Sequence, residues 1–170
     1  MARADAAFTE FVTTRSVSLL RTAYLLTGDR HLAEDLLQTA LTKAYPLWGG
    51  IREPRAAESY VRTAMVRTLI SWRKRHSWTR ETAFAAPPEH PQAVAPGDDI
   101  ESRTRLWPIV LTLPPRQRAV VVLRYYEDLT EPQTAEILGC STGAVKSHNA
   151  RALHTLRARL GEPEDAWRSS

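Results

Sequence analysis

The side chains best suited to bind a ligand gather near the C-terminus, within residues 129–160. No Asp or Glu occurs between Glu136 and Glu162. Cations and hydrogen-bond donors without neighbouring acids favour a polyanion, and DNA offers both phosphates and base edges. The donors of this stretch are Lys146, Ser147, His148, Asn149, Arg151, His154, Arg157 and Arg159.

A short helix and a tight turn are expected to position this basic stretch. Thr130 and Gln133 have the spacing of a capping box, and Pro132 falls in a first helical turn, where proline is tolerated. Gly139 predicts a left-handed stop, after which Ser141 or Thr142 can cap a second helix. This order is typical of a helix-turn-helix that reads the major groove. The donors expected on its DNA-facing side are Lys146, Ser147, His148 and Arg151.

A second basic span covers residues 59–80 and also lacks acids. Aromatic residues are interleaved with its cations, so phosphate neutralisation and base stacking are both available, as a single-stranded or unwound site requires. A solvated basic helix with its tryptophans in the core is the alternative. The residues concerned are the cations Arg62, Arg67, Arg73, Lys74, Arg75 and Arg80 and the aromatics Tyr60, Trp72 and Trp78.

Composition argues against catalysis, metal binding and cofactors. The formal net charge is +4 and the pI is about 9.6, with the positive charge clustered. Cys140 is the only cysteine, and the five histidines lack metal-ligand spacing. The acid pairs Glu34-Asp35 and Glu127-Asp128 are sequence neighbours, which do not face each other on a helix. We expect no catalytic residues, no metal and no cofactor.

The chain is expected to fold as two all-α domains joined by a linker. Residues 82–101 are rich in Pro and Ala and form the predicted linker between domains at 5–81 and 102–161. No strand-like alternation occurs. No apolar run reaches the roughly 18 residues that cross a bilayer, so we expect a soluble cytoplasmic protein without membrane insertion.

Helix boundaries follow from capping and breaking residues. Gly28 should end a first helix and Asp29 should cap a second, while Gly49, Gly50 and Pro54 predict a loop before a third helix from about Ser59. In the second half, residues 113–115 (Leu-Pro-Pro) stop one helix and start another. Residues 120–123 (Val-Val-Val-Leu) favour a strand by propensity, but the flanking arginines fit an amphipathic helix.

Several of these motifs together resemble the extracytoplasmic-function group of bacterial RNA polymerase sigma factors. The C-terminal half resembles region 4 of that group, and the N-terminal half resembles region 2. For region 4 the matching segments are LPPRQRAVVVLRYYEDLT (113–130), AEILGCS (135–141), GAVKS (143–147) and RAL (151–153). For region 2 they are AEDLLQ (33–38), KAY (43–45), YVR (60–62) and ISWRKR (70–75).

The resemblance implies three partners: core RNA polymerase, promoter DNA and a cognate anti-sigma factor. Region 2 would dock on the clamp helices of the largest polymerase subunit through Asp35, Gln38 and Leu41, and region 4 would meet the polymerase flap. The loop 51–59 with Tyr60 would capture a flipped base of the −10 element. The residues implied at the −10 element are Arg52, Arg55, Tyr60, Arg67, Arg73, Lys74 and Arg75. Those implied at the −35 duplex are Arg124, Thr142, Lys146, Ser147, His148 and Arg151.

Two other functions remain open from the sequence. A stand-alone helix-turn-helix regulator of the response-regulator type would explain residues 143–148 but not the basic aromatic span or Asp35 and Gln38. A protein-binding helical adaptor would explain neither basic helix. Several residues also depart from those common in the family: Arg67 stands where Asn is common, Gln133 where Glu is common and Ala144 where Thr is common, and Pro132 is unusual at its position.

Overall fold

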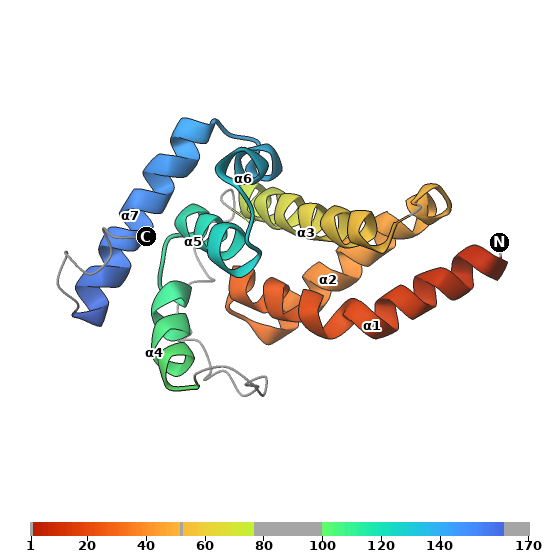
Figure 1. The fold of residues 1–170 in the computed structure, drawn as a ribbon, viewed down its shortest axis with the longest axis horizontal. Coiled ribbons are helices and arrows are strands. Elements are labelled where there is room, and N and C mark those ends of the chain that lie inside the picture. The colour runs from red at the N-terminus through yellow and green to blue at the C-terminus, as the bar shows by residue number, and fades with distance from the viewer. Residues whose placement is uncertain (1, 52, 77–99, 162–170) are drawn as a thin grey trace. The chain divides into compact units, whose positions relative to one another are not determined.

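The computed structural model describes residues 2–51, 53–76 and 100–161, and every regular element in these ranges is helical. The chain divides into two compact units, residues 1–87 and 88–170. The expected all-α, two-domain fold is therefore confirmed (Figure 1). The predicted linker falls almost entirely on residues outside the described ranges, so its boundaries stay a prediction.

The first unit is built from three helices that pack on one another. They are α1 (Ala2–Thr27), α2 (Arg30–Ala44) and α3 (Pro54–His76), with a 3₁₀ turn, η1 (Tyr45–Gly50), after α2. Each helix contributes fully buried apolar side chains to one core, and α2 contacts both of its neighbours. The largest of these side chains are Leu19, Leu26, Leu36, Met65, Val61 and Val66.

The predicted turn between α1 and α2 is confirmed. Gly28 adopts a left-handed φ of 74°, and the Asp29 carboxylate accepts a hydrogen bond from the Leu32 amide at 2.8 Å. Glycine has no Cβ and therefore takes a left-handed φ readily, and an Asp cap satisfies an amide that the helix start leaves unpaired. This short sequence therefore ends one helix and begins the next.

The predicted loop before α3 is wrong in its extent. We expected a loop through residues 51–59, but α3 already begins at Pro54, and Trp48 to Gly50 belong to η1. Proline at a first helical position loses no hydrogen bond, so Pro54 starts the helix that we predicted to begin only at about Ser59. Arg55 consequently lies on a helix, and Tyr60 lies within α3 rather than at its start.

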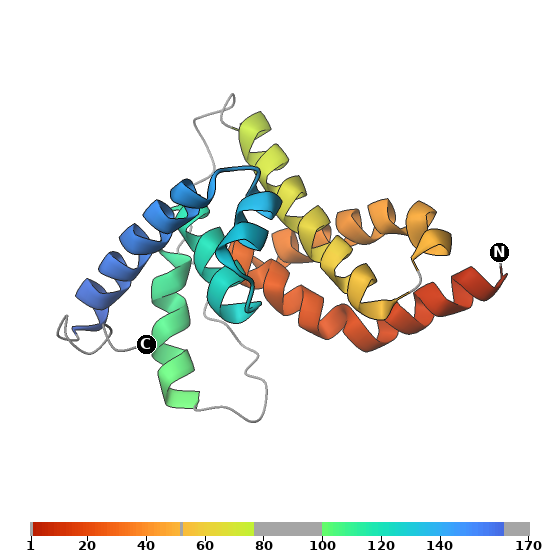
Figure 2. The ribbon, with the colours of Figure 1, turned by 45° about the horizontal axis from the view of Figure 1, so that its top comes forward.

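The second unit contains α4 (Ile100–Leu111), α5 (Pro115–Val121), α6 (Glu131–Leu138) and α7 (Thr142–Leu160). A π-helical turn, η2 (Val122–Tyr126), continues α5. The long helix α7 packs against α4, α5 and α6 (Figure 2). Residues 120–123 are buried and helical, as the flanking arginines predicted.

The capping signals of the second unit are confirmed. Thr130 and Gln133 form both bonds of the capping box, and Gly139 ends α6 with a φ of 65°. Of the two cap candidates for α7, Ser141 is the one used, since its hydroxyl accepts from the Ala144 amide at 3.0 Å. Helix, left-handed turn and second helix are thus specified by neighbouring residues.

Candidate nucleic-acid interface

The first turns of α7 present the predicted DNA-binding donors in three directions. Ser147 and Arg151 are exposed and one turn apart, so they share the outward face of the helix. Lys146 is exposed and approaches α6, where its Nζ lies 3.8 Å from the Glu131 carboxylate. His148 is half-buried on the opposite flank. The four predicted donors therefore cover a broad exposed face of α7, with Ser147 and Arg151 in its middle and Lys146 and His148 at its two edges.

His148 lies in a positively charged environment. Burial, together with the nearby guanidinium groups of Arg116 and Arg151, lowers the pKa of His148 below its ordinary value. The side chain is therefore predominantly neutral at pH 7 and can both donate and accept a hydrogen bond. Arg116, at the start of α5, is exposed and acts electrostatically on His148, an effect that the sequence did not predict.

Arg124 and Tyr125 belong to a network that joins η2 to α7. The Arg124 guanidinium donates to the Leu129 carbonyl and lies 5.9 Å from the centre of the Tyr125 ring. The Tyr125 hydroxyl accepts a hydrogen bond from the Asn149 amide at 3.0 Å. Arg124, predicted to contact the −35 duplex, therefore also shapes the loop before α6. A π turn in this position agrees with the frequent use of such turns at functional sites.

Thr142 begins α7 and is half-buried. It lies one turn before Lys146, so the two share the side of α7 that approaches α6. Backbone amides at this helix start carry partial positive charge, which favours a phosphate. The position agrees with a role at the duplex backbone, and that role stays a prediction.

The predicted −10 residues of α3 fall on different sides of the helix. Tyr60, Arg67 and Lys74 recur at every seventh position, close to two full turns, and form one exposed stripe. Arg75 is adjacent to this stripe, and its guanidinium donates to the Ser71 hydroxyl at 3.1 Å. Arg55 and Arg73 lie on another side of α3. Arg52 lies outside the described residues, as do Trp78 and Arg80 of the basic span.

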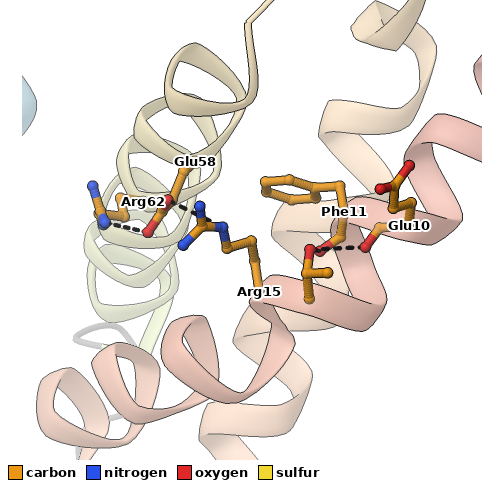
Figure 3. A network of polar contacts seen from close by, with 6 residues as sticks. Glu10, Phe11, Arg15, Glu58 and Arg62 are labelled. Carbon is orange, nitrogen blue, oxygen red and sulfur yellow. Dashed lines mark hydrogen bonds and ion pairs between the residues drawn. The ribbon is translucent and has the colours of Figure 1, made fainter.

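A charged cluster fixes the first half of α3 to α1 (Figure 3). The Glu58 side chain is 12% exposed and lies between Arg62, one turn further along α3, and Arg15 of α1. Arg62 bonds one carboxylate oxygen, and the Arg15 Nε lies 3.7 Å from the other. Glu58 therefore holds part of the predicted −10 surface in place, a role that the sequence did not reveal because Arg15 is distant in the chain.

The predicted polymerase-docking residues lie along α2 at intervals of three. Asp35 and Gln38 are exposed, and Leu41 is half-buried. Gln38 and Leu41 line a groove of about 310 Å³ between α1 and α2, together with Phe8, Val12, Thr42 and Tyr45. The structure thus places an acid, an amide and an apolar side chain beside a mostly apolar groove.

Aromatic contacts support the wall of this groove. The rings of Phe8 and Tyr45 lie 5.0 Å apart edge to face, and Phe8 contacts Trp48 in the same way at 5.0 Å. The Tyr45 hydroxyl donates to the Asp5 carboxylate at 2.7 Å, which raises the pKa of Tyr45. Tyr45 is nevertheless 49% exposed, so an apolar surface remains accessible next to Gln38.

Within the described ranges, no helix is long and apolar enough to cross a membrane. No group of three or more His, Cys, Asp or Glu side chains in those ranges is arranged to hold a metal ion.

The only titratable groups on the exposed side of α7 are His and basic residues. The chemistry offered by this surface is thus recognition by hydrogen bonds and positive charge.

Both units match models of known families. Residues 11–79 match sigma-70 region 2, and residues 104–156 match sigma-70 region 4. The RNA polymerase sigma-E factor of Streptomyces avermitilis is 40% identical over 156 residues, which cover 90% of this chain and 84% of that protein. The ECF RNA polymerase sigma factor SigW of Bacillus subtilis is 28% identical over 166 residues, covering 91% of this chain and 89% of that protein.

A solved structure shares the fold. The sigma factor RpoE from Bartonella quintana, determined in complex with the anti-sigma factor NepR, has a TM-score of 0.71 and 21% identity, covering 91% of this chain and 97% of that chain. The chain therefore belongs to the extracytoplasmic-function group of the sigma-70 family of RNA polymerase sigma factors. The match of both units favours a sigma factor over the stand-alone regulator.

Proposed function

We propose that this chain recruits core RNA polymerase to a set of promoters and helps to open them, without catalysing a reaction itself. The observation that carries the proposal is the pairing of a capped helix-turn-helix with a separate basic aromatic helix in one sigma-family chain. Duplex recognition and strand capture need different surfaces, and the chain offers one of each.

Asp35, Gln38 and Leu41 are the proposed contacts to the clamp helices of the polymerase. Their spacing along α2 and the adjacent groove support this assignment, because a docking helix would find polar and apolar partners side by side. The flap is the proposed contact for the second unit. Neither contact requires a cofactor or a metal.

The stripe of Tyr60, Arg67 and Lys74 is proposed to hold the melted −10 strand. An exposed aromatic ring offers a stacking platform for an unpaired base, and the following cations can follow the backbone. Unstacking one base costs a few kcal/mol, which stacking and phosphate contacts must offset. Arg75, adjacent to this stripe, is proposed to add a phosphate contact beside it. Arg55 and Arg73 are proposed to contact the −10 element from another side of α3, and Arg52 stays a proposed −10 residue outside the described ranges.

The exposed face of α7 is proposed to read the −35 element as duplex. Arg151 and Ser147 share the outward face and are the proposed base-edge readers. Lys146, His148, Thr142 and Arg124 are proposed to contact the flanking phosphates or bases. Two separate readers on one chain increase affinity through effective concentration once either is bound.

Regulation by an anti-sigma factor is also proposed, in the cytoplasm where transcription takes place. It is supported by the complex of the Bartonella quintana relative with its anti-sigma factor, whose sigma subunit has a similar fold.

Co-purification with core polymerase tests the proposed docking site. The chain should bind core tightly, and Asp35→Ala should weaken this binding by about tenfold, the loss of more than 1 kcal/mol that marks a hot-spot residue near the centre of an interface. Glu10→Ala is the matched control, because it removes an exposed acid of the same unit on the side of α1 away from Phe8. Normal binding by Asp35→Ala would exclude this residue from the docking site.

A further inference from the structure

An acid lies directly beside the proposed DNA-reading surface. Lys146 comes from the acid-free helix α7, and its Nζ lies 3.8 Å from Glu131 Oε2 at the first residue of α6. The Lys146 side chain is 66% exposed, whereas that of Glu131 is 29% exposed. A carboxylate thus projects from the neighbouring helix toward the surface that is expected to meet phosphates.

Glu131 is not needed to cap α6. The Thr130 hydroxyl accepts from the Gln133 amide at 3.3 Å, and the Gln133 side chain accepts from the Thr130 amide at 2.9 Å. These two bonds satisfy the start of the helix. The Glu131 carboxylate is therefore available to face Lys146.

The ion pair also contributes little to the stability of the unit. Pairs with one well-exposed partner are screened by water and salt, so their contribution is small and for many of them not measurable. The consequence of the pair lies instead in binding. When a phosphate approaches Lys146, it must compete with Glu131 and is repelled by it, so binding to any duplex is weakened.

The bases of the major groove differ in how they meet a carboxylate. Guanine presents two acceptors and thymine a carbonyl, which a carboxylate repels, and adenine places an acceptor beside its amino group. Cytosine presents an amino donor at N4, which a carboxylate can accept. A hydrogen bond from a cytosine opposite Glu131 would therefore offset the repulsion between this carboxylate and the DNA phosphate. The other bases offer no such compensation.

We propose that Glu131 is a specificity-determining residue of the second unit: it weakens binding to most duplexes and selects a cytosine next to the phosphate held by Lys146. This inference rests on the proposed function, because it assumes that α7 faces duplex DNA. Glu131 on α6 would thus provide base selectivity that the cations of α7 do not provide by themselves.

The test uses holoenzyme reconstituted from the full chain and core polymerase, with promoter duplexes randomised across the upstream element. Wild type, Glu131→Gln and Glu136→Gln are compared by sequencing the retained duplexes and by measuring the affinity for an unselected duplex. Glu136→Gln is the matched control, since it removes the same charge from an exposed position on another side of α6.

Wild type and Glu136→Gln should select a cytosine at one position. Glu131→Gln should lose that preference and bind the unselected duplex at least threefold more tightly. Equal behaviour of the two variants, or an equal loss of affinity by Glu131→Gln on all duplexes, would overturn the proposal. Failure of wild type to select any upstream sequence would instead contradict the proposed function of α7, so the two failures are distinguishable.

Discussion

The two basic helices, α3 and α7, differ in what their cations contact. On α3, Arg62 bonds Glu58 and Arg75 bonds Ser71, so at least two cations are held by their own helix. On α7, Lys146 lies 3.8 Å from a carboxylate of the neighbouring helix, whereas Arg151 is exposed and takes part in no ion pair within the described ranges. Arginine side chains that are bonded to neighbouring side chains form a preorganised surface, whereas an exposed arginine keeps its hydrogen-bond donors for a ligand.

This difference suits the two proposed ligands. A melted strand is flexible, and a helix held in place by the Glu58 ion pairs and by the Arg75–Ser71 hydrogen bond can impose one path on it. A duplex is already rigid, so its reader needs accessible donors on a well-capped helix more than an internal network. The comparison predicts that mutations in the Glu58 cluster act mainly on stability, and mutations of exposed residues on α7 mainly on binding.

The largest effect is expected from the core of the first unit. Leu36 is fully buried on α2, and Leu36→Ala should destabilise that unit by about 2–5 kcal/mol, because the cavity is only partly refilled. Hydrogen exchange followed by mass spectrometry should show faster exchange in α1 to α3 and unchanged exchange in α4 to α7. Equal acceleration in both would show that the units do not fold independently.

The Glu58 cluster should have the next largest effect. Glu58→Gln removes a nearly buried carboxylate from between Arg15 and Arg62 and should cost about 1–3 kcal/mol of unfolding free energy. Glu34→Gln removes an exposed partner of Arg30 and should cost less than about 0.5 kcal/mol. Urea denaturation of both variants measures the difference. Similar small losses would mean that the cluster does not hold α3 against α1.

On α7 the expected loss is one of binding. Arg151→Ala should weaken holoenzyme binding to the selected promoter by about 1–3 kcal/mol, with much less effect on unselected DNA, if Arg151 reads a base. Its thermal unfolding should be unchanged, because the side chain is exposed. Equal losses on all sequences would instead identify Arg151 as a phosphate contact.

The start of α7 offers a smaller test. Ser141→Ala removes the cap of the Ala144 amide and should destabilise the second unit by about 1 kcal/mol. Ser147→Ala makes the same chemical change at an exposed position within the helix and should leave stability nearly unaltered. Thermal denaturation compares the two variants, and equal melting temperatures would contradict the capping role.

The smallest effect is a pH dependence through His148. Its lowered pKa means that the unfolded chain binds a proton more readily than the folded one. The folded state therefore loses stability on acidification. The contribution of neutral His148 to stability is complete above the ordinary histidine pKa of about 6.5 and is lost as the pH falls through the lower pKa of the folded state. DNA phosphates favour the protonated form, so duplex binding should tighten by about two- to threefold from pH 8 to pH 6. His148→Gln should lack that part of the change, measured by fluorescence anisotropy.

Local sequence patterns predicted the second unit well because its signals are short-range. The capping box, Gly139 and Ser141 each act within a few residues, so their spacing alone indicates the turn. The start of α3 was misplaced because a proline after two glycines fits a loop as well as a first helical turn. The ion pair of Arg15 with Glu58 and the electrostatic effect of Arg116 on His148 join residues distant in the chain, so neither has a local pattern.

The most direct test of a two-site promoter factor is strand opening by the reconstituted holoenzyme. A promoter recovered by selection is treated with permanganate, which modifies unpaired thymines, in the presence of core polymerase, this chain, or both. Reactive thymines should appear in the downstream element only when core polymerase and this chain are both present. They should disappear when base pairs are inserted between the two elements. Opening by core alone, or opening that ignores the spacing, would contradict the account.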